Sequence, residues 1–182
     1  RINFKGAFLQ DALLSLAITR VLFDEVDYDL INGFKKDAHR QEEIVDKHSR
    51  VWINDSKATN LDATIQALNS FDECYIHLIL GGDDKGVDLS ELFLKLQNKD
   101  VEIYAIGSNS DRLMDLANQY NIKAHKCDVL KSAVSLIDKT HTKESIAILS
   151  PAAASLDQYS SYKQRGDEFR DLLLPQSSLV VG

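Results

Sequence analysis

Two kinds of hydrophobic pattern alternate along the chain from about residue 50 onward. Short, almost continuously apolar runs predict buried strands at residues 51–54, 75–80, 101–106, 122–125 and 145–149. Between these runs apolar residues recur at helical spacing, as in Leu89, Leu92, Phe93 and Leu96. Buried strands separated by amphipathic helices predict a mostly parallel sheet with helices on both faces. Because crossovers between parallel strands are right-handed, we expect an α/β fold of the doubly wound, Rossmann-like class.

The first 49 residues follow a less regular pattern. Helices are expected at about residues 7–23 and 28–35, and Glu43-Ile44-Val45 is expected to pair with strand 51–54 as a hairpin. This stretch has too few apolar residues for a core of its own. We therefore expect residues 1–49 to be the tail of a preceding domain plus a connector, and residues 50–182 to form the Rossmann-like domain. The whole chain is expected to be a fragment of a longer protein.

Composition narrows the classes of function. Of the 182 residues 44% are hydrophobic, which is enough for an ordered core, and the formal net charge is −7. An acidic chain without a cluster of Lys and Arg among aromatic residues is not expected to bind nucleic acid. No apolar run approaches the roughly 20 residues that cross a bilayer, so no membrane association is expected.

Cysteine and histidine are sparse and scattered. Cys74 and Cys127 lie in or beside predicted strands and form no C-x-x-C pair, so free thiols in a reducing cytoplasm are expected. His77 is expected in the core and His141 at the surface. Because no residues have zinc-ligand spacing, we expect no metal site.

Three segments that directly follow predicted strands carry candidate chemistry. They are Asn54-Asp55-Ser56-Lys57-Ala58-Thr59-Asn60, Gly81-Gly82-Asp83-Asp84-Lys85-Gly86 and Ser150-Pro151-Ala152-Ala153-Ala154-Ser155. The carboxyl ends of parallel strands meet at one edge of a sheet, where ligands bind in open α/β folds. Strand-to-helix turns direct backbone N–H groups there, and Ser155 is expected at the start of a helix. With Lys57 and Lys85, these segments predict a site for a small dicarboxylate or a phosphate.

Each segment also has an ordinary structural interpretation. The first is compatible with a capped turn, the second with a tight glycine turn that carries a solvated lysine, and the third with a small-residue packing turn. The phosphate-binding pattern G-x-x-x-x-G-K-[ST] and the dinucleotide pattern G-x-G-x-x-G are both absent. From the residues alone, the prediction ends at an anion-binding α/β domain.

The same segments resemble the Mur ligase family, in particular its D-glutamate-adding branch. The string NDSKATN of residues 54–60 is similar to that branch's version of the motif, and SPAAASLDQYSSYKQRGDEF of residues 150–169 matches it in order and spacing. The resemblance covers about residues 50–174 strongly and 1–49 weakly. It implies an ATP-dependent amide ligase of three domains, of which this chain is the last domain and the end of the central one, inactive by itself.

The resemblance also implies a reaction. ATP phosphorylates the carboxylate of UDP-N-acetylmuramoyl-L-alanine, and the amine of D-glutamate then attacks the acyl phosphate in peptidoglycan precursor synthesis. Mg²⁺ is implied as well, with its ligands in the central domain outside this chain. A monomer is expected.

Residue roles follow from the resemblance, position by position. Five residues are implied to hold the two carboxylates of D-glutamate: Thr59, Lys85, Ser155, Leu156 and Tyr162. Four are implied to contact ATP: His39, Arg40, Asp55 and Lys57. Lys57 is also the catalytic candidate, because it would face the phosphates or the developing negative charge.

The chain departs from the family pattern at its start. Gly6-Ala7-Phe8-Leu9 stands where the family has Gly-x-His-Asn, and Tyr162 replaces a more common phenylalanine. Two other interpretations stay open: another Mur-type or folylpolyglutamate-type ligase, and a non-catalytic anion-binding Rossmann-like module.

Overall fold

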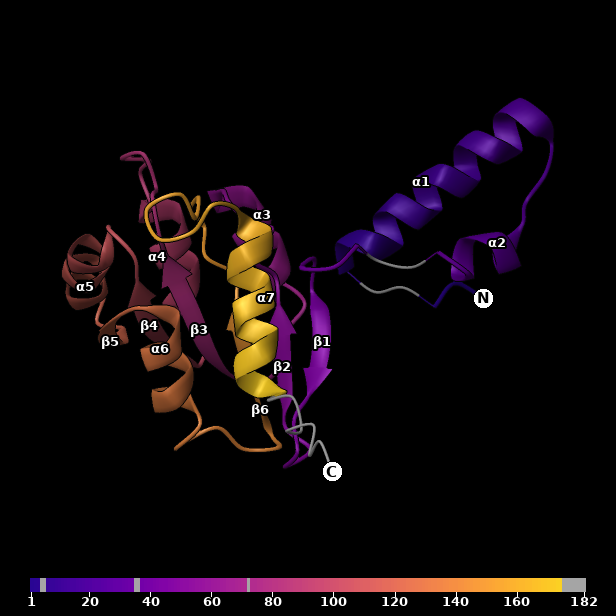
Figure 1. Cartoon of the computed structure of the whole chain (residues 1–182). Coiled ribbons are helices and arrows are strands. Elements are labelled where there is room, and N and C mark those ends of the chain that lie inside the picture. Colours follow the sequence, from indigo (N-terminus) through magenta and orange to yellow (C-terminus); the bar gives the residue numbers. More distant parts are fainter. Residues whose placement is uncertain (4–5, 35–36, 72, 175–182) are drawn as a thin grey trace, which may run out of the picture.

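The computed structural model describes residues 1–3, 6–34, 37–71 and 73–174 (Figure 1). Its elements, in chain order, are α1 (Gly6–Phe23), α2 (Tyr28–Asn32), β1 (Glu42–Val45), β2 (Val51–Asn54), α3 (Leu61–Leu68), β3 (Tyr75–Gly81), α4 (Ser90–Leu96), β4 (Val101–Ile106), α5 (Ser110–Gln119), β5 (Lys123–Asp128), α6 (Leu130–Ile137), β6 (Ser145–Leu149) and α7 (Tyr162–Leu173). All five predicted strands from residue 50 onward are present. The predicted helix near residues 28–35 ends earlier, at Asn32, and residues 35–36 lie outside the described ranges.

The strands form one sheet of six in the order β1-β2-β6-β3-β4-β5. Five of them pair in parallel, while β1 pairs antiparallel with β2 at the edge. The doubly wound α/β fold is therefore confirmed, and so is the predicted hairpin. Since β6 lies between β2 and β3, the three strands that precede the candidate segments are direct neighbours.

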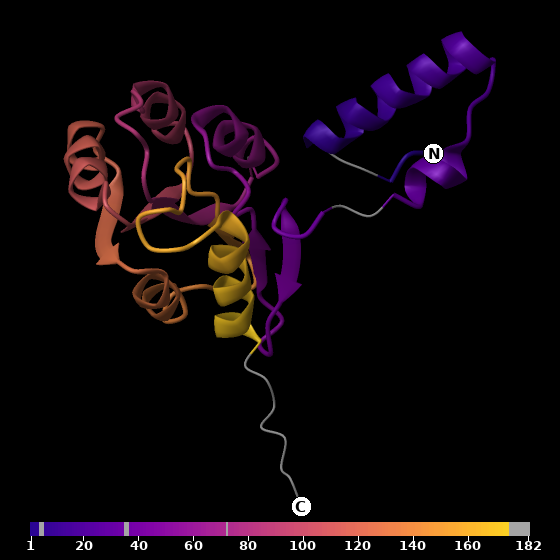
Figure 2. The ribbon, with the colours of Figure 1, turned by 45° about the horizontal axis from the view of Figure 1, so that its top comes forward.

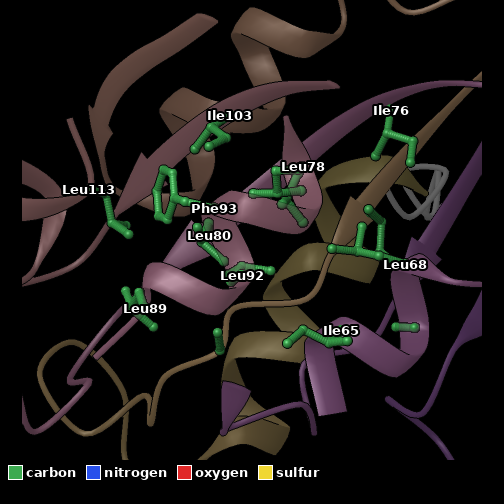
Figure 3. Packing of buried hydrophobic residues seen from close by; sticks show 14 of the residues in the cluster. Ile65, Leu68, Ile76, Leu78, Leu80, Leu89, Leu92, Phe93, Ile103 and Leu113 are labelled. Atoms are coloured by element: carbon green, nitrogen blue, oxygen red, sulfur yellow. The ribbon is translucent and has the colours of Figure 1, made fainter. Parts of the chain in front are cut away.

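Helices cover both faces of this sheet (Figures 1 and 2). On one face α3, α4 and α5 pack on inward side chains such as Leu78, Leu80 and Ile103, which are fully buried (Figure 3). On the other face α6 and α7 pack on Ile79 and Tyr104. Because successive strand residues point to opposite faces, each apolar strand serves both cores, which explains its continuous hydrophobicity.

Helices α1 and α2 stand to the side of the sheet, beyond its β1 edge (Figure 2). α1 buries Phe8, Ala12 and Leu16 but exposes apolar side chains along much of its length: Leu13, Leu14, Ile18, Val21, Leu22 and Phe23. This agrees with the expectation that the stretch lacks a core of its own. Within the described ranges, no helix is long and apolar enough to span a bilayer.

One prediction about a single side chain is wrong. His141 was expected at the surface, but it is only 5% exposed. Its ring nitrogens bond the Ser145 hydroxyl at 2.7 Å and the Val51 carbonyl at 3.1 Å, and its ring packs edge-on against Trp52. Ser145 is close in sequence and Val51 is remote. Together they satisfy both ring nitrogens, so the ring can be buried. Cys127 is buried and Cys74 half-buried, and both are free thiols.

Candidate functional site

Three loops meet at the carboxyl edge of the sheet, as the strand order requires. They are loop A (residues 55–60, after β2), loop B (residues 82–88, after β3) and loop C (residues 150–161, after β6). An isolated antiparallel bridge between Asp83 and Ala154 joins loops B and C, with both N···O distances at 2.9 Å. Loop A is bonded to loop C through the Ser150 hydroxyl, which donates to the Asp55 carboxylate at 2.8 Å. The three candidate segments therefore form one continuous surface.

Loop A presents its lysine and buries its acid. The Asp55 carboxylate, 4% exposed, also accepts from the Gln41 N–H at 3.1 Å. The Lys57 backbone N–H donates to the His39 carbonyl at 3.0 Å, while its ammonium lies 3.2 Å from the Asp37 carboxylate. Lys57 is thus fixed at its backbone, whereas its side chain is held by an exposed ion pair of the kind that contributes little energy.

The helix after loop A, α3, is capped by Asn60, whose side chain accepts from the Ala63 N–H at 2.9 Å. Neither Ser56 nor Thr59 provides this cap. Ser56 instead donates its hydroxyl to the Tyr162 carbonyl at 2.8 Å. The capping interpretation of the segment therefore applies to Asn60, while Thr59 is half-buried and does not cap the helix.

The two connector residues predicted to contact ATP have different surroundings. His39 is 5% exposed; its Nδ1 lies 3.0 Å from the Asn54 amide nitrogen, and its ring packs against Gly166, where a Cβ would come within 2.3 Å of Nδ1. Arg40 is exposed. A cavity of about 180 Å³ gathers Arg40, Asp55 and Lys57, with Phe8 and Gln41 among its other lining residues. His39 is not part of that lining and instead supports the Lys57 backbone.

The residues predicted to bind an amino acid lie on loops A, B and C and the start of α7. Lys85 is exposed at the tip of loop B, and Leu156 is 65% exposed. Ser155 is 2% exposed and opens a single turn, in which its carbonyl accepts from Gln158 and Tyr159. The expectation that Ser155 begins a helix is wrong: α7 begins at Tyr162, after a Ser161 cap, because residues 156–161 continue loop C.

The sequence reasoning missed Arg165 as a member of the site. Its side chain is 1% exposed and donates to Ser56 of loop A and to Ala153 and Ala154 of loop C. Burial lowers the pKa of Arg165 to about 10, although the charge of Asp157 opposes that shift, so the group remains a cation at neutral pH. A signal was available, because Arg165 precedes Phe169 by four residues and therefore lies on the buried face of α7.

Within the described part of the chain, no group of three or more His, Cys, Asp or Glu side chains could hold a metal ion. The described residues therefore offer no group of three such ligands to Mg²⁺. Arg40, Lys57 and Lys85 instead bring cationic side chains to the loop surface. Such a surface suits phosphate and carboxylate groups, which form strong charge-assisted hydrogen bonds.

The close packing of loops B and C allows a stability test. Gly82 has φ 141°, and a Cβ there would lie 2.2 Å from the Ala154 carbonyl oxygen. Gly82→Ala is expected to lower the free energy of unfolding by about 2 kcal/mol, through backbone strain and this collision. Gly86→Ala is the matched control, since Gly86 also has positive φ (74°) but no neighbour within 4 Å of the added atom. Urea unfolding followed by the fluorescence of the single Trp52 measures both; equal losses would contradict the packing argument.

The chain is similar in sequence to curated ligases. No family model matches the chain. Curated relatives named UDP-N-acetylmuramoylalanine–D-glutamate ligase include those of Campylobacter jejuni (47% identity over 171 residues) and Helicobacter pylori (45% over 181 residues), each aligned with 94% of this chain. The chain spans about two fifths of the length of these relatives, 42% and 43% respectively.

Solved structures support the fold. The UDP-N-acetylmuramate–alanine ligase of Thermotoga maritima superposes with a TM-score of 0.65 at 16% identity, over 92% of this chain and 38% of that one. The folylpolyglutamate synthase of Mycobacterium tuberculosis, complexed with ADP and AMPPCP, superposes with a TM-score of 0.63 at 15% identity, over 92% and 41%. At these identities the likeness to the solved structures shows the fold alone. The relationship to D-glutamate ligases rests on the sequence relatives. At 45–47% identity over nearly all of its length, the chain is a homologue of part of these D-glutamate ligases.

Proposed function

We propose that this chain is the amino-acid-binding part of an ATP-dependent ligase that joins D-glutamate to UDP-N-acetylmuramoyl-L-alanine. The observation that carries the proposal is the meeting of loops A, B and C at one sheet edge, in a chain 47% identical to a ligase named for this reaction. ATP would activate the carboxylate of the UDP-sugar as an acyl phosphate. The amine of D-glutamate would then attack the acyl carbon, and phosphate would leave.

The contribution of this chain would be to position the incoming amino acid. Lys85 and Thr59 would hold one carboxylate of D-glutamate, and Ser155, with the backbone at Leu156 and Tyr162, would hold the other. Fixing the amine beside the acyl phosphate converts a bimolecular encounter into a step within one complex, which can supply much of the rate enhancement.

The nucleotide would lie on the other side of loop A. Arg40 and Lys57, which line the same cavity, would face its phosphates, and Lys57 would stabilise the negative charge that develops on the acyl carbon's oxygen. The buried Asp55 also lines that cavity, and the edge of its carboxylate there would accept a hydrogen bond from the ribose. His39 would act through the backbone that it supports. Mg²⁺ would be held by residues outside this chain, and the reaction would occur in the cytoplasm, where ATP is available, in a monomer.

The test is phosphate release by the full-length ligase that contains this chain, supplied with ATP, Mg²⁺ and UDP-N-acetylmuramoyl-L-alanine. Release that depends on D-glutamate and not on L-glutamate is expected. A parallel reaction with a folate and L-glutamate tests the polyglutamate alternative. Release in that reaction alone would replace the proposed substrates, and release in neither would leave the anion-binding module as the better interpretation.

Lys85→Ala is expected to raise the KM for D-glutamate about 10- to 100-fold, because a charged hydrogen bond to the substrate carboxylate is lost. The KM for ATP should stay within about twofold, since loop B does not line the cavity of Arg40 and Lys57. Steady-state kinetics with each substrate varied in turn gives both values. Lys95→Ala, which removes an exposed lysine of α4 outside the three loops, is the control. Equal losses for the two substrates would contradict the role of Lys85.

A further inference from the structure

Asp84, the residue before Lys85, is an acid buried at the base of an exposed loop. Its side chain is 8% exposed. One carboxylate oxygen, Oδ2, accepts from the Asn109 amide and from the Arg112 guanidinium, each at 2.7 Å. The other, Oδ1, accepts from the Gly86 N–H at 3.0 Å. The carboxylate therefore joins loop B to Asn109, in the connection between β4 and α5, and to Arg112 in α5 itself.

Both donors also hold other atoms of loop B. The side-chain amide oxygen of Asn109, Oδ1, accepts from the Gly82 N–H at 3.0 Å, and the Arg112 guanidinium donates to the backbone carbonyl of Val87. Loop B is consequently fixed at residues on both sides of Lys85. Lys85 itself adopts φ 51°, a left-handed conformation that costs a residue with a Cβ about 1–2 kcal/mol. The flanking contacts keep the backbone in that conformation.

An isolated surface ion pair would not fix the backbone of loop B in this way. Exposed pairs contribute little because water competes for both groups and both side chains lose freedom. Here the carboxylate is shielded, it accepts three hydrogen bonds, and Arg112 binds a side chain and a backbone carbonyl at once. Arg112 can do so because its planar group carries several donors, whereas a lysine offers a single point of charge.

We propose that Asn109 and Arg112 are positioning residues, which act through Asp84 to hold loop B so that Lys85 is presented to the substrate carboxylate. This inference rests on the proposed function for its substrate. Neither residue touches the amino acid in this proposal. They determine how well the ammonium of Lys85 is placed, so their loss should weaken D-glutamate binding and leave the nucleotide site unchanged.

The kinetic test uses Arg112→Ala in the full-length ligase. The KM for D-glutamate should rise about tenfold, with the KM for ATP unchanged within about twofold. Because Arg112 acts through Lys85, adding Arg112→Ala to Lys85→Ala should cause no further loss. Arg112→Lys should recover only part of the loss. Lys126→Ala is the matched control, because it removes an ion pair between Lys126 of β5 and Asp111 of α5. It should change neither KM. The proposal would be overturned if Arg112→Ala raised the KM for D-glutamate as much in the Lys85→Ala background as in wild type. It would also be overturned if Arg112→Ala alone left that KM unchanged.

A second measurement needs no activity. Trypsin can cut the Lys85–Gly86 bond only when loop B leaves its fixed conformation. Limited proteolysis of the 182-residue chain, with mass spectrometry of the products, should show cleavage there about tenfold faster in Arg112→Ala than in wild type or Lys126→Ala. Unchanged cleavage would overturn the fixing of loop B. Faster cleavage in Arg112→Ala, combined with no D-glutamate-dependent phosphate release by the full-length wild-type ligase, would refute the proposed function while retaining the role of Arg112 in the loop.

Discussion

Arg165→Met is expected to lower the free energy of unfolding by about 2–5 kcal/mol, because two buried carbonyls would lose their donor at a cost of about 1–3 kcal/mol each. The guanidinium Nη2 donates to the Ser56 carbonyl at 2.9 Å and to the Ala153 carbonyl at 3.2 Å, and Nε donates to the Ser56 hydroxyl at 3.0 Å. Methionine is similar in length but donates no hydrogen bond. The two carbonyls would therefore stay buried without a donor, and each such group is costly.

The same contacts connect loop A, loop C and α7, so the effect should extend beyond overall stability. Urea unfolding followed by Trp52 fluorescence measures the free energy, and Lys163→Met, an exposed change on the same helix, is the control. Arg165→Lys should lie between wild type and Arg165→Met, because one ammonium cannot reach acceptors on both loops. A loss below about 1 kcal/mol for Arg165→Met would show that the loops hold together without this cation.

The architecture was predictable because it depends on local patterns. Continuous apolar runs and helical spacing gave the strands and helices, and the rule that parallel strands share a carboxyl edge placed Lys57 and Lys85 on one surface before the strand order was known. The order β2-β6-β3, which makes the three loops neighbours, could not be obtained from periodicity. It depends on which strands pair, and that information is spread over the whole chain.

The misjudged side chains share a cause. Arg165 and His141 are polar types that are seldom fully buried, and their burial depends on partners that are mostly remote in sequence, such as Val51 for His141. His39 shows the same limit in its surroundings, because nothing in its local sequence indicates that its ring packs against Asn54 and Gly166. Arg112 was not singled out at all, since nothing local to α5 indicates that its partner is an aspartate in loop B.

A buried chain of polar groups on β3 and β4 predicts how stability changes in acid. The Tyr104 hydroxyl donates its single proton to the Glu102 carboxylate at 2.9 Å, so the contact of 3.0 Å between His77 Nδ1 and Tyr104 requires that Nδ1 carry a proton. The neutral His77 ring then has an unprotonated Nε2, which is buried and has no hydrogen-bond partner among the described residues. A second proton there would create a buried charge without an acceptor.

Burial, followed by the charge of His141, lowers the pKa of His77 from 6.5 to about 4, while the charge of Glu102 opposes that shift. For Glu102, burial would raise the pKa, but hydrogen bonds from Lys123 and His125 and from two tyrosines outweigh it and lower the pKa to about 2. The stability contributed by neutral His77 is therefore lost as pH falls from about 6.5 to about 4. That contributed by ionised Glu102 is lost only below about 4.5.

His77→Phe should therefore flatten the pH dependence of stability above pH 4.5, where Glu102 remains ionised. Wild type should lose about 3 kcal/mol more than His77→Phe between pH 7 and about pH 4, since each unit of pKa shift corresponds to about 1.4 kcal/mol. Urea unfolding at half-unit pH steps measures the two slopes. The buried His141, whose pKa is also lowered by burial, is present in both proteins, so its burial contributes to both slopes. His48→Phe, at an exposed position in the β1–β2 turn, is the control and should follow wild type.

Parallel curves for wild type and His77→Phe would mean that the folded protein accepts a proton on His77. The ring would then need an acceptor for Nε2 that the neutral arrangement does not contain.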